Sequence, residues 1–181
     1  MRSGIIAAFA TLLAVASVAH AQKIVVDSDG TANFAAFRSY GGPDGQVAPN
    51  PATGLMIVSA IESELRSRGL VRNDKDPDFR IVVMAAAGMD LQGVGPSWNN
   101  ERYKSWGGYG NPNALMNVTT GTLLIDLVET KNKRSVWRGV AKDVFVAPPS
   151  GDLTKDAREM ESLVNKTVGK MFKKYPVKPN K

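Results

Sequence analysis

The sequence contains no cysteine, so disulfide bonds contribute nothing to whatever this chain folds into. This matters because the N-terminal segment has the pattern of an export signal. Arg2 supplies a positive start, residues 5–18 form an apolar run, and Ala19-His20-Ala21 matches the small-x-small pattern that signal peptidase cleaves. We therefore expect residues 1–21 to be a cleaved signal peptide and the protein to be periplasmic or secreted. Exported proteins are free to form disulfides, and a chain without them must be held together by burial alone.

Removal of the signal peptide would also remove the only histidine, His20. A mature chain beginning at Gln22 then has neither histidine nor cysteine, which excludes imidazole bases, cysteine nucleophiles and metal sites with His or Cys ligands. The acidic turns at residues 27–30 and 74–78 lack ligands that a calcium loop requires. Without cysteine there is no lipid anchor, and no later apolar run has the length of an integral membrane span. We expect no catalytic residue, no cofactor and no metal, and the sequence leaves the oligomeric state open.

The formal net charge is +6 at pH 7, and it becomes one unit less positive when Arg2 leaves with the signal. Most of the positive charge is dispersed, but a cluster lies near the C-terminus: Lys170, Lys173, Lys174, Lys178 and Lys181. An exported chain without a nucleic-acid-binding motif is not expected to bind nucleic acid. Two interpretations of the cluster stay open: a solvated helix face, which is the more common explanation, and contact with anionic lipid headgroups or surface polysaccharide.

Two amphipathic helices are predicted, over residues 54–68 and 152–175. Gly69 suits the left-handed conformation that ends the first helix, and Leu70 is then expected to fold back onto its last turn. The second helix has acidic residues at its start and lysines at its end, which match the helix dipole. Its apolar residues follow helical spacing: Leu153, Ala157, Met160, Val164, Val168, Met171 and Tyr175. We expect Met160, Val164, Val168 and Met171 to pack against the sheet.

About five strands are predicted from runs of apolar and alternating residues. They cover residues 23–27, the end of the segment 34–40, 78–84, 118–129 and 134–146, and the last two form a hairpin. With the two helices, these strands predict an α+β fold: a two-layer sandwich in which a mainly antiparallel sheet carries both helices on one face. We expect a single domain over residues 22–176, followed by a flexible tail over residues 177–181.

Residues 88–117 of this domain show neither helical nor strand periodicity and are rich in glycine. A long structureless segment in a compact domain is uncommon and indicates a functional or a mobile loop. Its large aromatic side chains could stack on sugar rings, receive a partner's apolar side chain or settle at a membrane interface. Alternatively the rings fold back as a lid over an open sheet face, because large aromatics are usually at least partly buried. The candidate partner-binding residues are Trp98, Tyr103, Trp106 and Tyr109.

An enzymatic function is still chemically possible through four carboxylates, because a pair of carboxylic acids can hydrolyse a glycosidic bond. The candidates are Asp90, Glu101, Asp126 and Asp143. They fall on different elements, and nothing in the sequence brings two of them together. Asp126 alternates with apolar residues on a strand, where a surface carboxylate is the usual explanation. No Gly-x-Ser-x-Gly elbow and no glycine-rich nucleotide fingerprint occurs.

The hairpin segments Thr120-Gly121-Thr122-Leu123-Leu124-Ile125-Asp126-Leu127 and Val136-Trp137-Arg138-Gly139-Val140-Ala141 resemble a bacterial envelope family known only as a domain of unknown function, family forty-one thirty-six. Weaker similarity extends over nearly the whole mature chain. The resemblance implies an exported protein or lipoprotein of a Gram-negative bacterium. Because the chain has no cysteine to carry a lipid, we expect no lipid anchor. The resemblance implies no activity and no catalytic residue. Within the second segment, Trp137 is expected to be buried, with Gly139 allowing close approach of a backbone or ring.

We expect a non-catalytic, soluble periplasmic accessory protein that binds another component of the cell envelope, either a protein or a glycan. The export signal, the missing reactive side chains and the aromatic loop favour this function. The alternative is a carboxylate-dependent hydrolase acting on cell-wall glycan. That enzyme would need two of the four candidate carboxylates in one cleft with raised pKa values.

Overall fold

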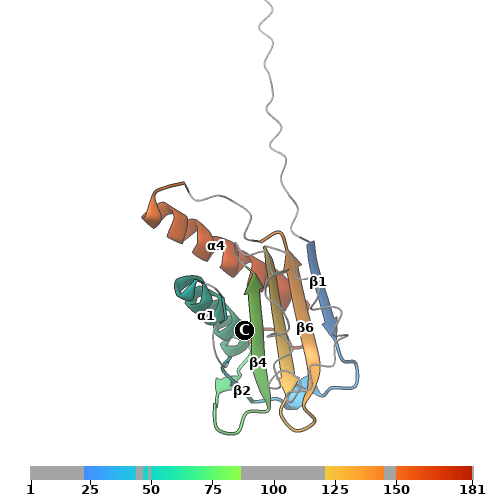
Figure 1. Ribbon diagram of the computed structural model, residues 1–181. Helices are drawn as coiled ribbons and strands as arrows, with labels where there is room; N and C mark the ends of the chain where they lie inside the picture. The colour runs from blue at the N-terminus through green and yellow to red at the C-terminus, as the bar shows by residue number, and fades with distance from the viewer. Residues whose placement is uncertain (1–22, 44–46, 49, 87–120, 145–149, 181) are drawn as a thin grey trace, which may run out of the picture.

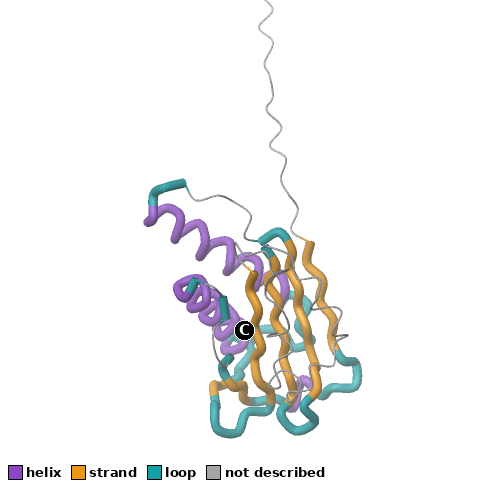
Figure 2. The backbone as a smooth tube through the Cα atoms, viewed as in Figure 1, coloured by secondary structure: helices purple, strands orange, loops and turns teal. Residues whose placement is uncertain are grey.

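The computed structural model describes residues 23–43, 47–48, 50–86, 121–144 and 150–180. These residues form a two-layer α+β sandwich, with α1 (Pro51–Arg66) and α4 (Leu153–Phe172) on one side of a mixed sheet (Figure 1). Figure 2 shows the same arrangement by type of secondary structure. The predicted fold class is therefore confirmed. The strands, in their order across the six-stranded sheet, are β1 (Lys23–Ser28), β6 (Arg134–Lys142), β5 (Thr122–Glu129), β4 (Phe79–Ala86), β2 (Ser39–Gly41) and β3 (Val71–Arg72).

The predicted hairpin of β5 and β6 lies at the centre of the sheet. Antiparallel pairing places Asp126 opposite Arg138 and Leu127 opposite Trp137. The register shifts between Leu127 and Val128, because β6 has one extra residue there, which is a β-bulge. β1 pairs antiparallel with β6, and β4 pairs antiparallel with β5. Four neighbouring strands are thus antiparallel, as the sequence pattern predicts.

The edge formed by β2 and β3 is parallel. β2 pairs in parallel with β4 and with β3, and α1 supplies the crossover that parallel neighbours require between β2 and β3. Asp78 holds β2 in place: its Oδ2 accepts hydrogen bonds from the backbone N–H groups of Arg38 and Ser39, each at 2.8 Å, and from the Ser39 hydroxyl at 3.1 Å. Partial burial acts to raise the pKa of Asp78, but these hydrogen bonds outweigh it and hold the pKa below its usual value.

The first helix begins earlier than predicted and ends where its glycine indicates. The Asn50 side chain accepts hydrogen bonds from backbone N–H groups of the first turn, and Pro51 occupies the first helical position, where a missing N–H costs nothing. At the other end, Gly69 has a φ of +81°. The N–H of Leu70 donates to the carbonyl of Leu65 at 3.2 Å, so the chain folds back on the last turn as expected.

The core fills the space between the helices and the inner face of the sheet. Trp137 is 1% exposed, as predicted, and its ring centroid lies 4.8 Å from that of Phe172 and 6.0 Å from that of Tyr175. Gly139 leaves room for the indole, because a Cβ at that position would come within 2.9 Å of the Trp137 ring. The apolar face of α4 packs here as predicted, through Met160, Val164, Val168 and Met171.

The segment after α4 is tied to the end of α1. We expected residues 177–181 to form a flexible tail, but Val177 packs against the core, and its carbonyl accepts a hydrogen bond from Arg68 Nε at 3.0 Å. The N–H of Asn180 donates to the carbonyl of Ser67 at 2.8 Å. These partners are distant in the sequence, so no local pattern reveals them.

Candidate functional site

The aromatic residues predicted for partner binding, Trp98, Tyr103, Trp106 and Tyr109, lie outside the described residues. The same holds for two of the candidate carboxylates, Asp90 and Glu101. The two interpretations of residues 88–117, a contact surface and a lid over the sheet, therefore both stay predictions.

The two remaining carboxylates, Asp126 and Asp143, are not brought together. Asp126 lies within β5, directly opposite Arg138 of β6. Asp143 follows the end of β6, where its side chain is exposed and its φ is +59°. The expectation that Asp126 is a surface carboxylate was wrong, because this residue is 0% exposed.

Asp126 is buried on the outer face of the sheet, the face away from the helices, and its partners there are half-buried. Arg138 donates a hydrogen bond to its Oδ2, and the Ser135 hydroxyl donates to its Oδ1. Ser135 and Arg138 are three residues apart, which in a regular strand would put them on opposite faces. The extra residue of the β-bulge brings both to the face of Asp126. A buried carboxylate with both oxygens engaged is suited to holding the hairpin in register, and less to transferring protons.

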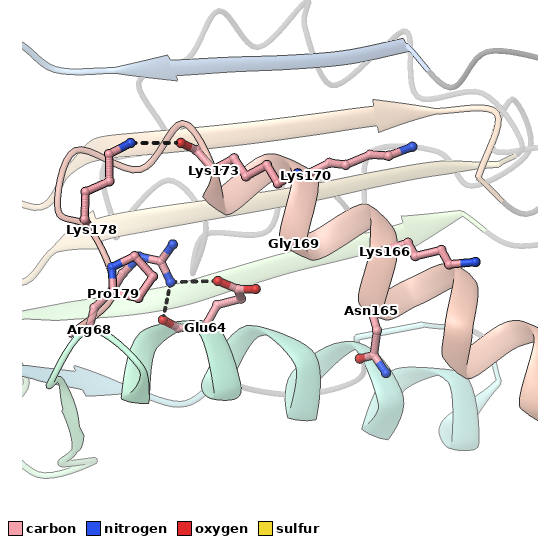
Figure 3. A pocket seen from close by; sticks show the side chains of 9 residues that line it. All are labelled: Glu64, Arg68, Asn165, Lys166, Gly169, Lys170, Lys173, Lys178 and Pro179. Atoms are coloured by element: carbon pink, nitrogen blue, oxygen red, sulfur yellow. Dashed lines mark hydrogen bonds and ion pairs between the residues drawn. The ribbon is translucent and has the colours of Figure 1, made fainter. Parts of the chain in front are cut away.

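Polar side chains also gather in a groove between α1 and α4, shown in close-up in Figure 3. Its volume is about 520 Å³. Glu64 of α1 and Arg68 of the turn after α1 line one wall, α4 lines the other, and the segment after α4 bounds the groove with Lys178 and Pro179. The two helices position this site because both pack on the same face of the sheet and against each other.

Arg68 joins the three segments that form the groove, and its side chain is only 3% exposed. The guanidinium donates to the carbonyls of Glu64 at 2.5 Å, Phe172 at 2.9 Å and Val177 at 3.0 Å, and it pairs with Glu64 Oε2 at 2.7 Å. It also lies over the rings of Phe172 and Tyr175, at 5.4 and 5.7 Å from their centroids. Burial raises the pKa of the Tyr175 hydroxyl to about 12, against the opposing effect of Arg68, so this phenol stays neutral.

The groove has an excess of positive charge. Arg68 and the lysines Lys166, Lys170, Lys173 and Lys178 line it, against the carboxylate of Glu64. Arg68 already pairs with Glu64, which leaves the four ammonium groups uncompensated. Within the described part of the chain, none of these lysines forms an ion pair; Lys178 Nζ donates to the carbonyl of Lys173 at 3.4 Å. Unpaired cations around a concave surface attract anions from solution.

The sequence indicated only one wall of this groove. Lys170, Lys173 and Lys178 belong to the C-terminal lysine cluster that was singled out, with a solvated helix face as the more common explanation. Glu64 and Arg68 belong to the first predicted helix, residues 54–68, and its spacing does not indicate which residues lie opposite them. Only the packing of one helix against the other makes a site of these two sets of residues.

Two further findings concern the described residues. In the described ranges, no helix is both long and apolar enough to cross a membrane. The same ranges hold no group of three or more His, Asp or Glu side chains placed to bind a metal ion.

Comparison with known proteins places the chain in a family and identifies solved structures of similar fold. The family described as Domain of unknown function (DUF4136) matches residues 24–177, which confirms the resemblance noted in the hairpin. A DUF4136 family protein from Bacteroides thetaiotaomicron has a TM-score of 0.57 and 16% identity, over 86% of this chain and 96% of that chain. A PDZ domain protein from Parabacteroides distasonis has a TM-score of 0.51 and 16% identity, over 88% of this chain and 36% of that chain.

A third similar structure is a PelC dodecamer from Paraburkholderia phytofirmans. Its TM-score is 0.45 and its identity 11%, over 83% of this chain and 97% of that chain. No curated protein matches the chain. The solved structures show the fold alone, because their identity to this chain is low.

Proposed function

We propose that this chain, which belongs to the DUF4136 family, is a non-catalytic binding protein of the Gram-negative cell envelope that works in the periplasm. The cationic groove between α1 and α4 carries this proposal. It is concave, its lysines have no carboxylate partners among the described residues, and the buried Arg68 holds its walls in place. Such a surface binds anionic groups without needing a nucleophile or a general base.

The periplasmic location is supported by the pattern of residues 1–21, which a signal peptidase would remove before Gln22. Mass spectrometry of the protein released by osmotic shock tests this directly. We expect a species that begins at Gln22. A species that keeps residues 1–21 in the membrane fraction would contradict the location, because the segment would then be an uncleaved anchor.

The hydrolase alternative receives no support from the described carboxylates. Asp126 has both oxygens engaged, and Asp143 is exposed beyond the end of β6. Asp90 and Glu101 lie outside the described residues, so the alternative stays a prediction without an observation in its favour.

The binding function is tested by capture from crosslinked cell envelope. A groove variant with Lys166→Gln, Lys170→Gln and Lys173→Gln is compared with the wild type. A surface variant with equal charge loss, carrying Lys75→Gln, Lys131→Gln and Lys142→Gln, is the control, because these lysines are exposed and do not line the groove. We expect the wild type and the surface variant to retain an envelope component that the groove variant loses.

For a non-catalytic function, the captured component must also be chemically unchanged after it has been bound by the protein. Analysis of its mass before and after incubation with the purified protein decides this. Shortening of a captured glycan would contradict the non-catalytic function, and equal capture by the groove variant would contradict the assignment of the groove.

A further inference from the structure

We propose that the groove between α1 and α4 binds an acidic glycan, a chain of sugar rings that carries carboxylates together with free hydroxyl groups. This inference rests on the proposed function and names the partner of the same site. Three observations lead to it: the spacing of the lysines, the uncharged and acidic groups that accompany them, and the position of the exposed apolar side chains.

The lysines of α4 form a regular row along one side of the groove. Each residue turns the helix by about 100°, so Lys166, Lys170 and Lys173 fall within a sector about 60° wide. Their Cα atoms are separated by about 6 and about 4.5 Å along the helix axis. One pyranose ring has a comparable length, and an acidic polysaccharide with one carboxylate on each ring could therefore meet successive ammonium groups. Lys178, in the segment after α4, continues the positive charge beyond the end of the row.

The groove also offers hydrogen-bonding groups that can pair with sugar hydroxyls. Arg68 occupies Oε2 of Glu64, whereas Oε1 lies toward Gly169, within 3.4 Å of the position that a Cβ would take there. Among the described residues, this oxygen has no hydrogen-bond partner, so it is free to accept a bond from a ligand. Figure 3 shows the amide of Asn165 extending from α4 toward α1 on the same side of the groove. A carboxylate acceptor repels a phosphate but accepts a hydrogen bond from a sugar hydroxyl.

A membrane surface fits the groove less well than a glycan does. Binding to a bilayer is usually strengthened by apolar side chains that enter the interface beside the lysines. Among the described residues, the large apolar side chains that are exposed are Val25, Leu55, Val71 and Leu153. None of them lines the groove, and a concave site makes poor contact with a flat layer of headgroups.

The first experiment measures the affinity of the purified mature protein for a galacturonate oligomer of defined length, by calorimetry at low salt. The matched neutral ligand is the same oligomer with each carboxylate reduced to a hydroxymethyl group. We expect binding of the acidic oligomer only, weakened about tenfold in the groove variant, since each exposed charge contributes modestly and three are removed. The surface variant should bind like the wild type. Equal loss in the two variants would overturn the inference, because it would indicate attraction to overall charge.

The second experiment separates sugar recognition from attraction to any anion. Polyphosphate, poly-glutamate and vesicles containing phosphatidylglycerol are compared with the galacturonate oligomer. We expect Asn165→Ala, at an exposed position, to weaken binding of the oligomer and to leave binding of polyphosphate unchanged. Binding of polyphosphate, poly-glutamate or vesicles as tight as that of the oligomer would overturn the inference.

The outcomes also distinguish this inference from the proposed function. If the wild type captures an envelope component through the groove but does not bind the oligomer, the acidic-glycan inference fails and the binding function stands. If the oligomer is bound and also cleaved, the non-catalytic function fails. Circular dichroism and melting curves of each variant exclude loss of folding as the cause of a loss of binding.

Discussion

The two faces of the sheet bury their side chains in different ways. The inner face, under the helices, is packed with apolar and aromatic groups such as Trp137 and Phe172. On the outer face, one row across the sheet holds Asp27, Arg138 and Asp126 from neighbouring strands. Asp27 is exposed, the Arg138 side chain is 17% exposed and Asp126 is fully buried. The same strands therefore supply an apolar core on one side and, on the other, a buried carboxylate paired with a half-buried arginine.

In this sheet, a charge is buried where the strand register supplies its partners. A buried carboxylate is costly unless a cation and hydrogen-bond donors compensate it. β6 provides both to Asp126, because the bulge places Ser135 and Arg138 on the same face. Among the described residues, the core cluster that contains Val164 is made of hydrophobic side chains, so a charge introduced there would lack the partners that Asp126 has.

Val164→Asp is expected to have the largest effect. Val164 is 0% exposed on the inner side of α4, and an unpaired carboxylate there should cost more than about 4 kcal/mol of a total stability of about 5–15 kcal/mol. Urea unfolding followed by circular dichroism measures the loss. Ser162→Asp, at an exposed position of the same helix, is the control and should be close to neutral. An unchanged unfolding midpoint for Val164→Asp would mean that α4 does not carry the inner face of the core.

Asp126→Ala tests the outer face. The substitution leaves Arg138 partly buried without its carboxylate, which should cost about 2–3 kcal/mol. Asp27→Ala, at the exposed end of the same row, should change the free energy of unfolding by less than about 0.5 kcal/mol. Equal effects of the two substitutions would show that the buried Asp126 contributes no more to the free energy of unfolding than an exposed carboxylate does.

Gly139→Ala is a substitution on the inner face with a smaller expected loss of stability. The added Cβ would lie 2.9 Å from the far end of the Trp137 ring and 3.4 Å from Met171. Because the indole is enclosed by Phe172 and Tyr175, we expect overpacking to cost about 1–3 kcal/mol. Gly30→Ala meets nothing within 4 Å and serves as the control in the same unfolding assay. A stabilised Gly139→Ala variant would mean that the inner face still has room around Trp137.

Asp78→Asn should have the smallest effect, and that effect should depend on pH. The pKa of Asp78 is lower in the folded protein than its usual value of 3.8. Its ionised form therefore stabilises the fold above that pH, and the contribution disappears as the pH falls through the folded-state pKa. We expect the variant to be about 1 kcal/mol less stable at neutral pH and to approach the wild type at an acidic pH below the usual value of 3.8, where Asp78 becomes protonated in the folded protein. A constant difference at both pH values in urea unfolding would indicate that the charge of Asp78 does not contribute.

Much of the fold was predictable because local patterns determine its largest elements. Helical spacing indicated α4 and its buried residues, and alternating apolar residues indicated β4, β5 and β6. Gly69 and Leu70 marked the end of α1. The parallel pairing of β2 was not predictable, because β2 and β3 are too short to show a period and their pairing depends on the crossover through α1. The site was less predictable still, since its walls come from helices far apart in the sequence.

Composition establishes that this fold has no disulfide, and spacing along the chain establishes which faces of its helices and strands are apolar. Only in the folded chain is Asp126 buried, and only there do Lys166, Lys170 and Lys173 line the same groove as Glu64 and Arg68. The physical reason is that solvation of a charge depends on its neighbours in space. A bulge in β6 and the packing of α1 against α4 determine those neighbours, and no pattern within one segment predicts either feature.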